Sequence, residues 1–149
     1  MTAVPEPVPP PPAMSAADVA LLRLAENLLA KVWAPGRHEV ATALRTAAGT
    51  VHTGVHLEGS CRRSSICAEG VALGAACTAG ASLNEVDCVI SVQIKPAGMF
   101  RIIAPCGVCR ELLSDYSPHA TIWLTRPGSG EVIAVPALEL LPEKTRRCW

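Results

Sequence analysis

Aromatic residues are scarce in this sequence, and neither sign of charge is in excess. Its 149 residues include three Trp, one Tyr and one Phe, and its 13 Lys and Arg balance 13 Asp and Glu. A nucleic-acid groove needs clustered basic residues, and a platform for stacked bases needs aromatics, so we expect no nucleic-acid partner. The core must be built from Ala, Val, Leu and Ile, and the chain is long enough to bury one.

Long apolar runs are also absent, because no stretch approaches the roughly 18 residues that a membrane-spanning helix needs. The start, MTAVPEPVPPPPAM, has neither the basic segment nor the apolar segment of a secretion signal. We therefore expect a cytoplasmic protein with no membrane partner. In that reducing setting its seven cysteines bind metal or react more often than they form disulfides.

The N-terminal residues differ in composition from the rest of the chain. Residues 1–14 are rich in proline and poor in core-forming residues, which predicts a disordered or polyproline-II tail. We expect residues 15–149 to form one folded domain.

After this tail, helical and strand patterns alternate. Ser15 can cap a helix whose apolar face extends to about Val32, and Gly49 lies in the turn of a predicted β-hairpin. Further patterns predict helices over about 67–79 and 106–116, and strands over 85–94, 120–125 and the stretch that follows. Gly70 and Gly74 suggest a helix face that another backbone can approach closely. The alternation predicts an α/β fold with a layered sheet.

Cysteines and one carboxylate occur at the predicted starts of two helices. Cys67 and Glu69 lie in SSICAEGVALGAA, and Cys106 and Cys109 lie in APCGVCRELL. Free N–H groups at a helix start stabilise thiolates, and helix starts of an α/β sheet line up where ligands bind. Three thiolates suit a zinc ion whose fourth position stays open for catalysis, and Glu69 would lie near that position to transfer protons. The combination Cys-x-Glu … Pro-Cys-x-x-Cys resembles the three-cysteine form of a zinc-dependent deaminase signature.

Two other interpretations of these cysteines remain open. Cys106 and Cys109 could form a redox pair, although a dithiol needs neither Cys67 nor Glu69. A structural zinc site could recruit a distant fourth ligand such as Cys61. The open catalytic zinc site is favoured, because it uses all four residues of the motif.

With these motifs, the chain resembles the cytidine deaminase superfamily from about Ser15 to Trp149, and within it the blasticidin S deaminases. The segments that carry the resemblance are HEVATALRT, TGVHLEGSCRRSSICAEGVALGAA, APCGVCRELLSDYSP and, more weakly, LELLP. The resemblance implies a three-layer α/β/α fold with a five-stranded mixed sheet, assembled as a homotetramer. It also implies one zinc ion per subunit, held by Cys67, Cys106 and Cys109, with Glu69 as the catalytic proton carrier.

The resemblance further implies a hydrolytic deaminase that converts the amino group of a cytosine-type nucleoside to a carbonyl and releases ammonia. His56 replaces an Asn that cytidine deaminases use on the ribose, which favours blasticidin S or a related aminopyrimidine nucleoside as the substrate. A salvage deaminase of cytidine or deoxycytidine, or of another amino-heterocycle, is the alternative. The expected substrate-binding residues are His38, His56, Glu58, Ala68, Ala104 and Trp149.

Overall fold

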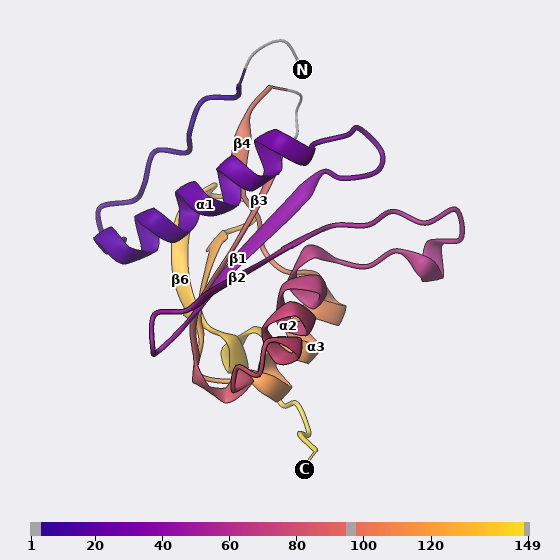
Figure 1. The fold of residues 1–149 in the computed structure, drawn as a ribbon. Helices are drawn as coiled ribbons and strands as arrows, with labels where there is room; N and C mark the ends of the chain where they lie inside the picture. Colours follow the sequence, from indigo (N-terminus) through magenta and orange to yellow (C-terminus); the bar gives the residue numbers. More distant parts are fainter. Residues whose placement is uncertain (1–3, 95–97, 148–149) are drawn as a thin grey trace.

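We describe the chain from a computed structural model, over residues 4–94 and 98–147 (Figure 1). The α-helices are α1 (Ala16–Val32), α2 (Ala68–Thr78) and α3 (Gly107–Tyr116), with short 3-10 helices at Arg62–Ser64, Leu83–Glu85 and Ala137–Leu140. The strands are β1 (Val40–Thr46), β2 (Val51–Val55), β3 (Val86–Ile94), β4 (Phe100–Ile102), β5 (Thr121–Thr125) and β6 (Val132–Pro136). The α/β alternation predicted from the sequence is confirmed.

The strands form one mixed sheet in the order β2-β1-β3-β5-β6. Only β3 and β5 run parallel among these pairs; the others are antiparallel. The sixth strand, β4, pairs with the end of β3 and lies off this path. The five strands β2, β1, β3, β5 and β6 form the predicted five-stranded sheet. With the short strand β4, the sheet has six strands, so the predicted number is corrected.

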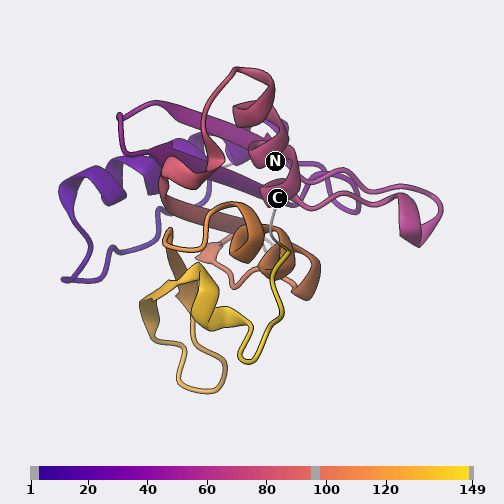
Figure 2. The ribbon, with the colours of Figure 1, turned by 90° about the horizontal axis from the view of Figure 1, so that it is seen from below.

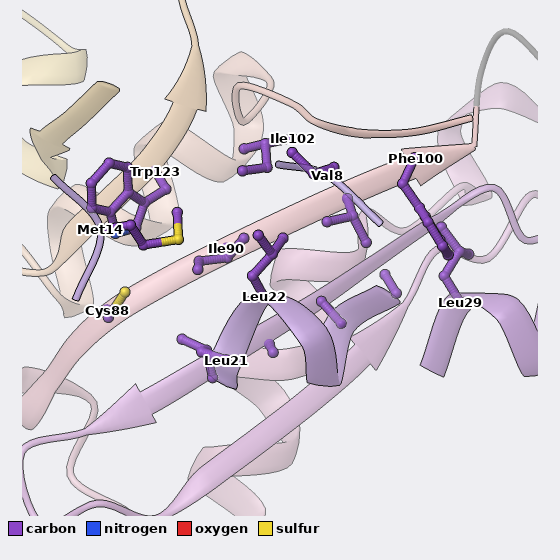
Figure 3. Close-up of a cluster of buried hydrophobic side chains, with 14 of the residues drawn as sticks. Val8, Met14, Leu21, Leu22, Leu29, Cys88, Ile90, Phe100, Ile102 and Trp123 are labelled. Carbon is purple, nitrogen blue, oxygen red and sulfur yellow. The ribbon is translucent and has the colours of Figure 1, made fainter. Parts of the chain in front are cut away.

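Helices cover both faces of the sheet, as the layered fold requires. Helix α1 packs on one face, and α2 and α3 lie on the other (Figure 1, Figure 2). On the α1 face, Leu22, Leu29 and Ile90 are fully buried with Met14 and Trp123 close by (Figure 3). Over residues 4–94 and 98–147, no helix has both the length and the apolar character that crossing a membrane requires.

Local sequence signals account for the boundaries of these elements. Ser15 caps α1, because its hydroxyl oxygen accepts a hydrogen bond from the backbone N–H of Asp18 at 3.1 Å. The turn between β1 and β2 contains Gly49 at φ +87°, a conformation that residues with a Cβ rarely adopt. The helix cap and the glycine turn both agree with the prediction from the sequence.

The proline-rich start is not a free tail over the residues that the structure describes. Val8 and Met14 are buried in the core on the α1 face. Both backbone groups of Val8 are bound by α1: its N–H donates to Glu26 Oε1 at 2.7 Å, and its carbonyl accepts from Arg23 at 3.0 Å. The expectation of disorder is thus corrected, because two apolar side chains and a buried carboxylate fix the segment in place.

Helix α2 approaches strand β2 closely at a glycine. A Cβ added to Gly54 would meet the Ala68 carbonyl and the Ala72 amide nitrogen far inside van der Waals contact, and would lie 2.9 Å from Val71 Cβ. At Gly74, by contrast, an added Cβ would meet no described atom within 4 Å. The close approach that the sequence suggested for the glycines of α2 is made instead by Gly54.

Candidate active site

Three thiols converge at the starts of α2 and α3. Cys67 is the N-terminal cap residue of α2, Cys106 is that of α3, and Cys109 follows in the first turn of α3. Their sulfur atoms all lie within 4.8 Å of one another, and those of Cys67 and Cys106 are 3.4 Å apart. The convergence predicted from the spacing is confirmed.

The chemistry of this thiol set fits a cation such as zinc. Burial raises the pKa of Cys67 to about 11 and raises the pKa of Cys109 as well. Burial opposes ionisation of Cys106 too, but the backbone N–H groups of Cys109 and Val108 hold the Cys106 pKa below its ordinary value. Three neighbouring thiolates therefore need a positive charge among them. Tetrahedral zinc with 2.3 Å bonds places its sulfurs roughly 3.8 Å apart, and the sulfurs here lie 3.4 Å apart in one pair and within 4.8 Å in the others.

One carboxylate is buried beside these sulfurs. Glu69 lies in the first turn of α2 with 4% of its surface exposed. Its Oε2 accepts a hydrogen bond from Cys109 Sγ at 3.4 Å. The carboxylate is thus held next to the three sulfurs and away from bulk water.

A cavity of about 230 Å³ opens in front of the sulfurs and the carboxylate. It lies where β1 starts, where β2 and β3 end, and where α2 and α3 begin. Its walls are formed by Glu39, Val40, His56, Cys67, Ala68, Glu69, Gln93, Ile103, Ala104 and Cys106. A small ligand could therefore contact Cys67, Cys106 and Glu69 at the same time.

Residues 15–125 match the family model described as the cytidine and deoxycytidylate deaminase zinc-binding region. The chain belongs to this deaminase family. Because the family domain binds zinc, the three-cysteine cluster is the part of this deaminase that can hold the ion.

Individual relatives agree with the family match. The chain is 30% identical to a blasticidin-S deaminase of Bacillus cereus over 138 residues, which is 90% of this chain and 96% of the relative. It is 31% identical to a cytidine deaminase of Burkholderia pseudomallei with a TM-score of 0.71, covering 85% of this chain and 98% of that structure. A cytidine deaminase of Mycobacterium leprae is 26% identical with a TM-score of 0.65, covering 84% and 97% respectively.

Of the substrate-binding residues predicted for this deaminase, three line the cavity: His56, Ala68 and Ala104. Glu58 is not part of the cavity wall but binds His56, since its Oε2 lies 3.0 Å from His56 Nε2. His38 is not part of the cavity wall either; its Nδ1 donates to the His56 carbonyl at 2.9 Å.

Trp149 lies outside the described residues of the deaminase, so its predicted role stays a prediction. The roles of His38 and Glu58 in substrate binding also stay predictions.

Sequence reasoning missed four residues of the cavity wall: Glu39, Val40, Gln93 and Ile103. The register of the sheet brings the first three to the cavity, since β1 and β3 pair with Val40 opposite Gln93. The N–H of His56 in turn donates to the Val40 carbonyl at 2.9 Å. Glu39 and Val40 lie in HEVATALRT, one of the segments that carry the resemblance, but only the pairing of β1 with β3 brings them beside Gln93.

The segment from residue 57 to residue 66 carries the deaminase chain from β2 to the first cysteine. It projects from the body of the molecule in both views (Figure 1, Figure 2). Leu57 and Ile66 pair through two backbone hydrogen bonds of 3.0 and 2.9 Å, which close the base of this projecting arm. Inside the arm, Ser65 donates to Glu58 Oε1 at 2.6 Å. The arm thereby fixes Glu58 and His56 relative to Cys67.

Proposed function

We propose that this deaminase hydrolyses the exocyclic amino group of a cytosine-type nucleoside. Water and the amino-bearing ring give a ring carbonyl and ammonia. The observation that carries the proposal is the buried carboxylate of Glu69 beside three converging thiols, in the wall of a cavity that Cys67 and Cys106 also line.

In this proposal Cys67, Cys106 and Cys109 hold zinc and Glu69 moves the protons. When bound, zinc supplies a nucleophilic water of lowered pKa. Glu69 Oε2 accepts a proton from the attacking water and delivers it to the ring nitrogen next to the amino-bearing carbon. The hydroxyl now on the ring carbon gives up the second proton, which passes through the same carboxylate to the amine as the carbon–nitrogen bond breaks, so Glu69 ends the cycle in its starting state.

The cavity wall supports a flat heterocyclic substrate. Val40 and Ile103 present apolar surface, which excludes water from the reacting ring. The backbone at Ala68 and Ala104 lies in the same wall, where it can bind the ring carbonyl and the leaving ammonia. These groups would orient the amino-bearing carbon toward the thiol cluster.

Blasticidin S is the substrate that we place first. The match to a blasticidin-S deaminase over 90% of this chain supports it, as does a histidine rather than an amide at position 56. A salvage deaminase of cytidine or deoxycytidine is the second candidate, which the likeness to the Burkholderia pseudomallei cytidine deaminase supports. An enzyme of the first kind would confer resistance to the antibiotic.

We further propose that the subunits assemble as a homotetramer in a reducing compartment such as the cytoplasm. Exposed apolar residues support the assembly: Leu57 and Ile66 on the projecting arm, and Val108 and Tyr116 on α3. A reducing setting suits the site, because oxidation would join Cys67 to Cys106, whose sulfurs are 3.4 Å apart, and remove two ligands. Fractionation of the source cells tests the location.

The decisive experiment measures ammonia release from blasticidin S, cytidine and deoxycytidine in parallel, using zinc-loaded protein. Glu69→Gln keeps the shape of the side chain but removes its proton-carrying carboxylate, so we expect turnover to fall at least about a thousandfold. Zinc content should stay at one ion per chain. Glu139→Gln, at an exposed position of the last 3-10 helix, is the matched control and should leave turnover unchanged. Full activity of Glu69→Gln would remove Glu69 from the mechanism.

A further inference from the structure

The proline-rich segment, residues 4–14, lies ahead of the part of the chain that the family model matches. Burial in this segment repeats every third residue: Pro5 and Val8 are buried and Pro11 is half-buried, whereas the residues between them are exposed. A polyproline-II helix has three residues per turn, so this period places one side of the segment against the domain. We call residues 4–14 the strap.

Helix α1 holds the strap at Val8. The Val8 N–H donates to Glu26 Oε1 at 2.7 Å, and the Val8 carbonyl accepts from Arg23 at 3.0 Å. Arg23 also donates to Glu26 Oε2 at 2.6 Å, so both oxygens of this carboxylate, which is only 2% exposed, have a partner. A buried carboxylate without such partners costs stability, so the three groups fix the position of the strap on α1.

The strap packs against β4, the short strand that leads to the catalytic cavity. The Val8 side chain belongs to one buried cluster with Phe100 and Ile102, the two buried residues of β4, and Figure 3 draws it between them. Strand β4 pairs with β3 over three residues, and Met99, just before it, forms an isolated bridge with Glu6 of the strap. The strap therefore meets this strand both at its start and along its buried side.

Strand β4 continues directly into the wall of the catalytic cavity, which Ile103 and Ala104 line. The sheet holds the backbone here through two hydrogen bonds: the Ile103 N–H donates to the Ser91 carbonyl at 3.0 Å, and the Thr125 hydroxyl donates to the Ile102 carbonyl at 2.6 Å. The position of the wall also depends on how the Ile102 side chain is packed from behind, because neighbouring groups move when a void opens in a closely packed interior.

We propose that the strap positions the Ile103–Ala104 wall of the catalytic cavity, acting through Val8 on Ile102. Glu26 and Arg23 are positioning residues in the same way, because they hold Val8 against the strand. The proposal rests on the proposed function only in taking this cavity to be the site of deamination. A void at Val8 should therefore loosen the wall locally and lower turnover, in addition to any weakening of the domain as a whole.

The first test needs no substrate. Site-resolved hydrogen–deuterium exchange of zinc-loaded protein compares Val8→Ala with the wild type. Val4→Ala, the same substitution at a strap residue that is 76% exposed, is the matched control and should match the wild type. The amides of β1, which contributes to the same core, report weakening of the whole domain. Val8→Ala should accelerate exchange at the hydrogen-bonded Ile103 amide by about tenfold more than it accelerates exchange in β1.

The second test measures ammonia release under conditions in which circular dichroism shows every variant to be folded. The kcat/KM of Val8→Ala for the best nucleoside substrate should fall by about fivefold to twentyfold, because small displacements of groups around a reacting substrate are costly. Glu26→Leu removes the acceptor of the Val8 N–H from the other side of the contact, so it should reproduce both effects. Val4→Ala should leave kcat/KM unchanged.

Equal acceleration of exchange at Ile103 and in β1 would overturn the inference, since the strap would then contribute only to the stability of the domain. An unchanged kcat/KM in folded Val8→Ala would overturn it as well. If the wild type released ammonia from no nucleoside, the proposed function would fail, and the exchange data would still decide whether the strap positions the wall.

Discussion

Replacing Gly54 with alanine tests whether close contact between β2 and α2 positions the catalytic groups. The added Cβ would overlap the Ala68 carbonyl and the Ala72 amide nitrogen, and would lie 2.9 Å from Val71 Cβ. Two of these three atoms belong to the helix backbone, which cannot rotate away as a flexible side chain can. The overlap must therefore push the first turns of α2 away from the sheet.

The expected cost follows from the overlap. Forcing an extra methyl group into a packed interior costs about 1–3 kcal/mol, and backbone overlap places Gly54→Ala near the upper value. For a chain of this size, about 3 kcal/mol corresponds to a melting temperature lower by roughly 6–12 °C. Because Ala68 lies between Cys67 and Glu69, the shift also displaces both functional groups. A displacement of about 1 Å can reduce turnover about a hundredfold.

Thermal unfolding and ammonia release should be measured together at one fixed protein concentration. Gly74→Ala is the matched control, since it lies inside α2 and its Cβ would meet no described atom within 4 Å. Alanine there should raise the stability by about 0.5–1 kcal/mol, as it does inside other helices. If Gly54→Ala matched the wild type in melting temperature and turnover, the reasoning on close helix–strand contact would be refuted.

Two further predictions concern the metal and the assembly. Cys106→Ala should lose bound zinc and melt at a lower temperature, because metal binding is coupled to folding, whereas Cys77→Ala at an exposed position of α2 should keep both; unchanged zinc content in Cys106→Ala would mean that the ligands are misassigned. The mass in solution, measured by light scattering, should be about four times the 15.6 kDa of one chain, and a monomer at micromolar concentration would contradict the tetramer.

Local signals were sufficient where one short segment determines the outcome. Ser15 caps the first helix and Gly49 turns the first hairpin, as their positions predicted. The cysteines could be predicted to converge because helix starts in an α/β sheet share one end of the sheet. The structure of the proline-rich start was harder to predict. Its proline content indicates an extended backbone but does not reveal that the Val8 N–H binds Glu26.

The sequence by itself determined the α/β class, the zinc-binding cysteines as a set and the carboxylate beside them, since each depends on residue type at short spacing. Only the tertiary structure decided which residues complete the cavity. Gln93 reaches it through the pairing of β3 with β1, and His56 is held there by contacts of its ring with Glu58 and of its backbone with His38. Gly54 likewise becomes important only when α2 lies against β2. These features depend on which distant segments pair and in which register, and that is settled by packing the whole chain.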